Sequence, residues 1–184
     1  MTRLIAMRGL PGSGKSTRAH QLLDEAAVGT MVRCGRDDYR RMLHGRPRHG
    51  DRVCEDQVTI AQHAAIEQLL LAGVDVLVDD TNLSLRNLET LAAIAWRCGA
   101  DFTVEDFTQV PLEDCIARDA LRAGDERLGA DLIRAMHSRH LAGKRLPLPV
   151  PAPNATADLL LCADGQSCGR RSITYPASAK RWAS

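Results

Sequence analysis

A glycine-rich segment near the start of the sequence has the residue types and spacing that bind phosphate groups. It reads Gly9-Leu-Pro-Gly-Ser-Gly-Lys15-Ser16, and it follows a short apolar run at residues 4–7. Glycine permits backbone conformations that aim N–H groups at phosphate oxygens, and the start of a helix favours negative charge. The segment therefore predicts a Walker A loop whose nucleotide-binding residues are Gly12, Ser13, Gly14, Lys15, Ser16 and Thr17.

The polar side chains of such a loop have separate tasks. Lys15 is expected to bridge the β- and γ-phosphates of a nucleotide, and the Ser16 hydroxyl is expected to bind a metal ion. The pattern lies between a predicted strand and a predicted helix, which is the context in which it functions. A glycine-rich turn with a solvated lysine is the alternative interpretation. The predicted cofactors are ATP and Mg²⁺.

Two carboxylates, Asp79 and Asp80, follow a predicted strand at residues 74–78. This is the position from which a Walker B carboxylate holds Mg²⁺ directly or through water. Neighbouring side chains of a strand point to opposite faces, so only one of the two can face the phosphates. The other should cap the next helix or meet solvent. The residue pattern leaves this choice open.

A second polar segment, Arg36-Asp37-Asp38-Tyr39-Arg40, follows a predicted strand at residues 30–34. It therefore lies at the carboxyl edge of the sheet, where open α/β folds bind ligands. One carboxylate could accept the proton of an attacking hydroxyl, while Arg40, on the same helical face, holds an anionic part of the substrate. Capping of a helix is the alternative role for either aspartate.

Two arginines later in the sequence, Arg118 and Arg122, lie one helical turn apart, and Arg127 follows across Gly124. Such a segment can close over a nucleotide and bring guanidinium charge to the phosphoryl group being transferred. A solvated helix face is the alternative interpretation. The sequence therefore predicts a helical lid that carries arginines.

Arginines are also concentrated between residues 33 and 52. The stretch contains seven of them against three aspartates, although the whole chain has a net charge of only +1. A local basic patch of this kind suits a phosphodiester strand. Aromatic residues are rare in the chain, so we expect contacts to phosphates rather than stacking on bases. The patch comprises Arg33, Arg36, Arg40, Arg41, Arg46, Arg48 and Arg52.

These candidate residues are positioned by strands that alternate with helices. Strands are predicted near residues 4–7, 30–34, 74–78 and 102–105, and helices fill the intervals. Alternation of this kind predicts an α/β P-loop kinase fold, with a parallel β-sheet of four to five strands and helices on both faces. We expect the kinase domain at residues 1–146, a proline-rich linker at 147–157 and a short tail at 158–184.

Composition excludes several classes of protein. No apolar run approaches the roughly 20 residues needed to cross a bilayer, and the start of the sequence lacks the pattern of a signal peptide. The six cysteines occur singly at irregular spacings, which is typical of reduced thiols rather than disulfides or a metal site. We therefore expect a cytoplasmic protein without a membrane partner. Its oligomeric state is not predictable from the sequence.

In order along the chain, these motifs resemble the kinase domain of the bacteriophage-type polynucleotide 5′-hydroxyl kinases. The resemblance spans roughly residues 3–145. The Arg-Asp-Asp-Tyr-Arg segment at 36–40 combined with Asp-Thr-Asn-Leu at 80–83 is its most specific part. The segments at 9–17 and 110–112 and the pair Arg118 and Arg122 complete it. It implies ATP-dependent phosphorylation of the 5′-hydroxyl end of DNA or RNA.

The resemblance also implies roles for individual residues. Asp37 corresponds to the general base, Arg40 to the arginine that engages the substrate phosphate, and Arg122 to the lid arginine on the donor phosphates. Asp80 corresponds to the aspartate of Asp-Thr-Asn, so the resemblance favours Asp80 over Asp79 at the reaction centre. The bifunctional bacteriophage enzymes continue into a phosphatase domain; here Cys162 stands where its nucleophilic aspartate belongs, and we expect no 3′-phosphatase activity.

Two other functions fit the same residues. A P-loop kinase that phosphorylates a hydroxyl of a sugar, a nucleoside or an antibiotic would share the loop, the aspartate after the strand and the arginine lid. A regulatory nucleotide-binding module without catalysis is the third possibility. The full set of Asp37, Arg40 and Arg122 argues against a degraded site.

Overall fold

A computed structural model describes residues 1–47 and 50–144 of the chain. The predicted linker at 147–157 and tail at 158–184 lie outside these residues. The strands are β1 (Arg3–Arg8), β2 (Met31–Cys34), β3 (Asp75–Val78) and β4 (Asp101–Asp106). The helices are α1 (Lys15–Glu25), α2 (Arg36–His44), α3 (Arg52–Leu71), α4 (Leu85–Arg97), α5 (Leu112–Ala120) and α6 (Ala130–His140), with a short 3-10 turn at Gly124–Glu126.

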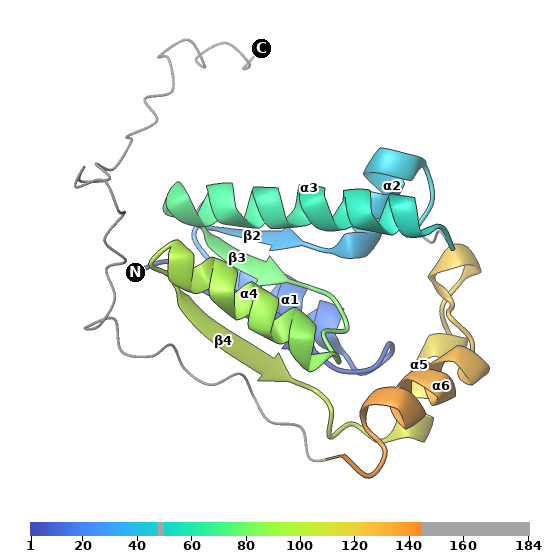
Figure 1. The fold of residues 1–184 in the computed structure, drawn as a ribbon. Helices are drawn as coiled ribbons and strands as arrows, with labels where there is room; N and C mark the ends of the chain where they lie inside the picture. The colour runs from blue at the N-terminus through green and yellow to red at the C-terminus, as the bar shows by residue number, and fades with distance from the viewer. Residues whose placement is uncertain (48–49, 145–184) are drawn as a thin grey trace, which may run out of the picture. The chain divides into compact units, whose positions relative to one another are not determined.

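The four strands form one parallel sheet in the order β2-β3-β1-β4 (Figure 1). This confirms the predicted α/β P-loop fold, with four strands in the described part of the chain. The strand with an alternating pattern, β4, lies at an edge of the sheet, as expected for a strand that is covered less completely.

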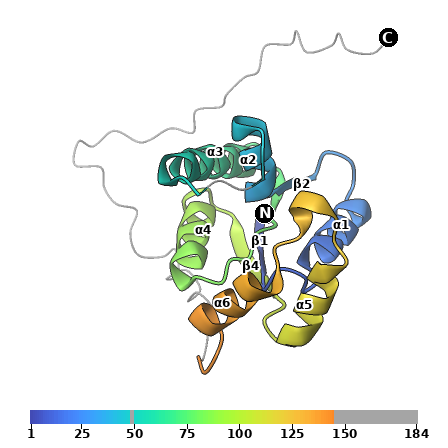
Figure 2. The same cartoon turned by 90° about the vertical axis from the view of Figure 1, so that its right-hand side faces the viewer.

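Helices cover both faces of the sheet because each strand sends alternate side chains to opposite sides (Figure 2). Leu4 and Val76 point to the face that packs against Ile66 of α3 and Leu88 of α4. The neighbouring side chains of β1 and β3 point the other way, where they pack with Ala19 of α1. The sheet is therefore buried on both sides, as the continuous apolar runs of its strands require.

A third apolar cluster joins the P-loop to the two helices of the predicted lid. Leu10 of the loop packs with Leu83, Cys115 of α5 and Ile133 of α6, all of them buried. The lid helices are thus part of the hydrophobic interior at their base. Helix α6 begins at Ala130, directly after Gly129, whose φ of 94° is one that residues with a side chain rarely adopt.

The parallel arrangement brings the chemical motifs together at one edge. The carboxyl ends of β1, β2 and β3 lead into the P-loop, into α2 and into Asp79 respectively. Because β3 lies between β1 and β2, the residues that follow it stand between the other two motifs. This is where open α/β sheets bind their ligands. In the residues that the structure describes, no helix is long and apolar enough to cross a membrane.

Candidate active site

The P-loop bends tightly around the start of α1 and presses against the lid helix α5. Gly12 and Gly14 have φ angles of 80° and 99°, which side-chain-bearing residues rarely adopt. A Cβ atom at Gly12 would also collide with the backbone carbonyl of Cys115. Ser13 is buried inside the loop, while Ser16 and Thr17 are exposed at the first turn of α1. The hydroxyl groups of Ser16 and Thr17 are therefore open to a ligand.

Lys15 is buried and folds back over its own loop. Its Nζ donates to the carbonyl oxygen of Leu10 at 2.7 Å and to Ser13 Oγ at 3.4 Å. Burial lowers the pKa of the Lys15 ammonium to about 8, although the nearby Asp79 carboxylate acts in the opposite direction. A desolvated ammonium of this kind is stabilised by any anion that reaches it, and a nucleotide phosphate is such an anion.

Asp79 faces the P-loop. Its Oδ1 accepts a hydrogen bond from Ser16 Oγ at 3.2 Å, and its Oδ2 accepts one from Arg33 Nε at 2.8 Å. Only 2% of the side chain is exposed. The Ser16 and Asp79 oxygens fit a magnesium site, because Mg²⁺ takes oxygen ligands and is held by few protein groups beside substrate phosphates. When bound there, the ion would offset phosphate charge.

Asp80 points to the opposite side, towards α2 and α3. Its Oδ1 accepts from the backbone N–H of Arg36 at 2.8 Å, and its Oδ2 accepts from Gln62 Nε2 at 2.7 Å. Burial raises the pKa of the Asp80 carboxyl to about 6. The structure thus differs from the expectation that Asp80 faces the phosphates. The second carboxylate caps α2, rather than the next helix, because β2 and its following helix lie directly beside β3.

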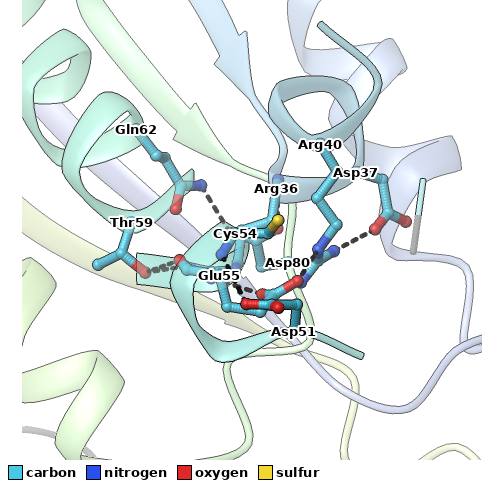
Figure 3. A network of polar contacts seen from close by, with 9 residues as sticks. All are labelled: Arg36, Asp37, Arg40, Asp51, Cys54, Glu55, Thr59, Gln62 and Asp80. Carbon is cyan, nitrogen blue, oxygen red and sulfur yellow. Dashed lines mark hydrogen bonds and ion pairs between the residues drawn. The ribbon is translucent and has the colours of Figure 1, made fainter. Parts of the chain in front are cut away.

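Asp37 and Arg40 lie together on α2 and are joined by an ion pair (Figure 3). Arg40 Nη1 donates to Asp37 Oδ1 at 2.5 Å. The Asp37 side chain is 65% exposed, so its second oxygen is open to a hydroxyl group. The structure therefore brings the predicted base and the predicted anion-binding arginine into contact.

Glu55, in the first turn of α3, organises this arginine. Arg40 donates to it through Nε at 2.6 Å and Nη2 at 2.8 Å, and Arg36 Nη2 donates at 2.9 Å (Figure 3). These bonds, with those from Arg40 dominant, lower the pKa of Glu55 to about 2. A guanidinium has five N–H donors. Three of those of Arg40 are occupied by Glu55 and Asp37, which leaves two for a substrate anion.

Sequence reasoning missed Glu55. The residue lies fifteen positions after Arg40, across a turn between two helices, and no local periodicity relates the two. A weak signal was present, because a run of arginines needs carboxylates to neutralise it if the run is to pack. Glu55 is the only glutamate of the first turn of α3, where a carboxylate also suits the helix dipole.

The predicted basic patch is largely neutralised. Arg33 pairs with Asp38 and Asp79, and Arg36 and Arg40 pair with Glu55. Arg41 and Arg52 have weaker contacts of 3.5 and 4.0 Å to Asp38 and Asp56. The expectation of an open basic surface at 33–52 therefore needs correction for Arg33, Arg36 and Arg40, whose charges are neutralised by short ion pairs, whereas Arg41 and Arg52 remain exposed.

The lid arginines lie at and just beyond the end of α5. Arg118 is exposed in the last turn of the helix, and Arg122 Nη1 lies 3.8 Å from Asp119 Oδ1. The charge of Arg122 acts on the P-loop, since it helps to lower the pKa of Lys15. Arg122 therefore lies near enough to the P-loop for its charge to act on Lys15.

Asp119 is a second residue that sequence reasoning missed. Its carboxylate is almost completely buried and accepts from the backbone N–H groups of Leu128 at 3.1 Å and Gly129 at 2.9 Å. It therefore ties the end of α5 to the start of α6. The signal in the sequence was an aspartate on the apolar side of the lid helix, beside Cys115.

Comparison with known proteins identifies relatives of this arrangement. The model of the AAA domain family matches residues 4–145. Among curated proteins, none matches the chain. A chain of the structure named "Structure of Pnkp1/Rnl/Hen1 complex" is 32% identical with a TM-score of 0.58, and the match covers 64% of this chain and 38% of that one.

Two further structures share the fold. A chain of the Pnkp1/Rnl/Hen1 RNA repair complex is 24% identical with a TM-score of 0.62, over 83% of this chain and 49% of its own. The Mycobacterium tuberculosis APS kinase CysC, in complex with AMPPNP and APS, is 19% identical with a TM-score of 0.52, over 83% and 84%. This chain thus spans less than half of the matched Pnkp1/Rnl/Hen1 chains. Because the family model covers residues 4–145, P-loop included, the chain belongs to the AAA domain family, and it binds nucleotides.

Proposed function

We propose that the protein transfers the γ-phosphate of ATP to the 5′-hydroxyl end of DNA or RNA. The observation that carries the proposal is the contact between Asp37 and Arg40. It lies at the carboxyl edge of the sheet, the same edge at which the P-loop follows β1. A base next to an anion-binding guanidinium suits a hydroxyl that is attached to a phosphodiester. The likeness to a chain of the Pnkp1/Rnl/Hen1 complex, which is named an RNA repair complex, supports a nucleic-acid acceptor.

In the proposed reaction the Asp37 carboxylate accepts the proton of the 5′-hydroxyl. The hydroxyl oxygen forms a bond to the γ-phosphorus, and the bond from that phosphorus to the bridging oxygen breaks, which releases ADP. Lys15 and Arg122 would stabilise the charge on the phosphoryl group, while Arg40 would hold a phosphate of the acceptor strand. Catalysis then consists mainly of alignment and charge stabilisation.

The test is transfer of label from γ-labelled ATP to an oligonucleotide with a 5′-hydroxyl end. Asp37→Asn should lose transfer by at least about 100-fold, in the range of general base catalysis, while ATP still binds with its original affinity. Asp24→Asn, an exposed aspartate of α1 away from the site, is the matched control and should behave as wild type. Transfer at the wild-type rate by Asp37→Asn would remove Asp37 from the mechanism.

A small-molecule acceptor is the second candidate, and the neutralised arginines of residues 33–52 favour it. A polynucleotide kinase should bind longer oligonucleotides better and lose affinity steeply as salt increases. A sugar or nucleoside kinase would show neither trend. Parallel assays with oligonucleotides of increasing length and with a panel of sugars and nucleosides therefore separate the two.

A further inference from the structure

A hollow of about 560 Å³ lies beside the candidate site, between α3 and α4. Its volume is in the range of pockets that bind small ligands. The polar residues that line it include Arg36, Gln62, His63, Arg86, Asn87 and Thr90. Apart from Arg36, they come from the middle of α3 and the first turns of α4.

The wall of the hollow is formed by residues of the candidate site. Glu55 and Asp80 line it, and Glu55 is the residue that holds Arg40. Arg40 in turn contacts Asp37. The hollow is therefore linked through Glu55 and Arg40 to the carboxylate proposed as the base.

The lining has the chemistry of a nucleoside site without stacking. Asn87 offers an exposed amide group and Thr90 a hydroxyl, whereas the buried Gln62 amide already donates to Asp80 and to the carbonyl oxygen of Cys34. Apolar atoms of Val78 and Leu91 form part of the surface. His63 adds an imidazole, and burial, with the charges of Arg36 and Arg97, lowers its pKa and so favours the neutral ring. A neutral imidazole has one donor and one acceptor, as the edge of a nucleobase does.

Arg86 supplies a second cation in addition to Arg40, and it lines the hollow itself. It is exposed, and among residues 1–47 and 50–144 no carboxylate forms an ion pair with it, whereas Arg36 and Arg40 are both paired with Glu55. Arg86 stands in the first turn of α4, where the helix dipole disfavours a cation. Helix stability therefore does not account for Arg86, but an anionic ligand would.

We propose that this hollow binds the acceptor strand next to its 5′ end, with a nucleobase between α3 and α4 and a backbone phosphate on Arg86. The proposal rests on the proposed function and assigns it a strand-binding subsite. Recognition is by hydrogen bonds to the base and one charged contact to the backbone. A strand of two or more nucleotides would therefore be a better acceptor than a mononucleotide.

The test compares Arg86→Gln with Arg97→Gln. Both arginines are on α4, but Arg97 lies at its far end, where its contact is Glu67. Arg86→Gln should raise the KM for a 5′-hydroxyl oligonucleotide about tenfold and reduce the salt slope of binding by about one, as loss of one phosphate contact does. The KM for ATP should stay within twofold, and Arg97→Gln should match wild type.

A second variant tests the hollow itself. Thr90→Phe adds an aromatic ring at an exposed position in the lining, so it should also raise the oligonucleotide KM and leave ATP binding unchanged. Unchanged oligonucleotide KM and salt slope in both variants would overturn the proposal.

Binding of a fluorescent 5′-hydroxyl oligonucleotide, measured without ATP, separates this proposal from the proposed function. If wild type binds the strand but transfers no phosphate, the proposed function fails, while weaker binding by Arg86→Gln still supports the hollow. If wild type does not bind the strand at all, the hollow proposal is overturned as well.

Discussion

Glu55 holds the guanidinium group of Arg40 in a two-point pair, with Nε 2.6 Å from Oε1 and Nη2 2.8 Å from Oε2. A planar fork fixed along one edge has only one orientation, so its remaining donors point in a set direction. The arginine on α2 is therefore oriented by a carboxylate on α3 before any acceptor arrives.

Replacement of Glu55 by glutamine should impair the acceptor side of the site. The amide retains the shape but presents an N–H group to one arginine donor, so Arg40 loses its fixed orientation. We expect a KM for the acceptor about tenfold higher and a KM for ATP within twofold, measured by steady-state kinetics. Glu67→Gln, on the same helix, is the control. Equal changes in both KM values would indicate a general loss of structure.

The charge of Glu55 should be present throughout the accessible pH range. Its folded pKa of about 2 is below the ordinary 4.5, so its stabilising contribution is complete above pH 4.5 and disappears as pH falls toward 2. The ratio of wild-type to Glu55→Gln activity should therefore be constant between pH 6 and 9. A ratio that varies across that range would mean that another titrating group depends on Glu55.

The two carboxylates after β3 should affect different substrates. Asp79 contacts Ser16, so Asp79→Asn should raise the Mg²⁺ concentration for half-maximal activity by about tenfold, as loss of a charged ligand group predicts. Asp80 contacts α2 and α3, so Asp80→Asn should leave that concentration unchanged and raise the acceptor KM. Magnesium titrations of both variants check this. The reverse pattern would mean that Asp80, and not Asp79, acts at the phosphates.

The buried ammonium of Lys15 should lower the free energy of unfolding of the nucleotide-free protein at neutral pH. Its folded pKa of about 8 lies below the ordinary 10.5. The unfolded chain thus binds more protons between those values, and stability rises with pH across that window. The pKa shift corresponds to about 3 kcal/mol of unfolding free energy. A variant without the ammonium would also lose the hydrogen bond to Leu10, which offsets about 1 kcal/mol of that gain.

The free energy of unfolding of Lys15→Met should therefore be about 2 kcal/mol higher than that of wild type at pH 7. The advantage should largely disappear at pH 10, and the variant should not transfer phosphate. Urea unfolding at the two pH values measures the difference. A variant less stable than wild type at pH 7 would mean that the buried ammonium is well compensated by its surroundings.

Loss of Asp119 should loosen the lid. Asp119→Ala leaves the N–H groups of Leu128 and Gly129 without their acceptor, which should cost about 1–3 kcal/mol of unfolding free energy. It also removes the partner of Arg122, so the KM for ATP should rise. Asp114→Ala, an exposed change on the same helix, is the control. An unchanged KM for ATP would mean that the contact between Asp119 and Arg122 does not contribute to nucleotide binding.

The sequence was sufficient to predict those features that depend on local order. The four strands and the helices after them follow from apolar periodicity and capping residues, and the P-loop follows from its glycines. Glu55 and Asp119 were not predictable because each acts through contacts formed only when separate helices pack. The same reason explains Arg33, Arg36 and Arg40, whose charges a linear count treats as free although Asp79 and Glu55 form ion pairs with them.

The opposite orientation of Asp79 and Asp80 divides the molecule into two separately adjustable parts. Asp79 faces the P-loop, in the half that we propose for the nucleotide, although it also accepts from Arg33 of β2. Asp80 faces α2 and α3, in the half that we propose for the acceptor. A single peptide bond is the border between them. Substitutions on α2, α3 and α4 can therefore exchange one hydroxyl-bearing acceptor for another while the nucleotide half stays as it is, which makes this chain a suitable scaffold for redirecting phosphorylation.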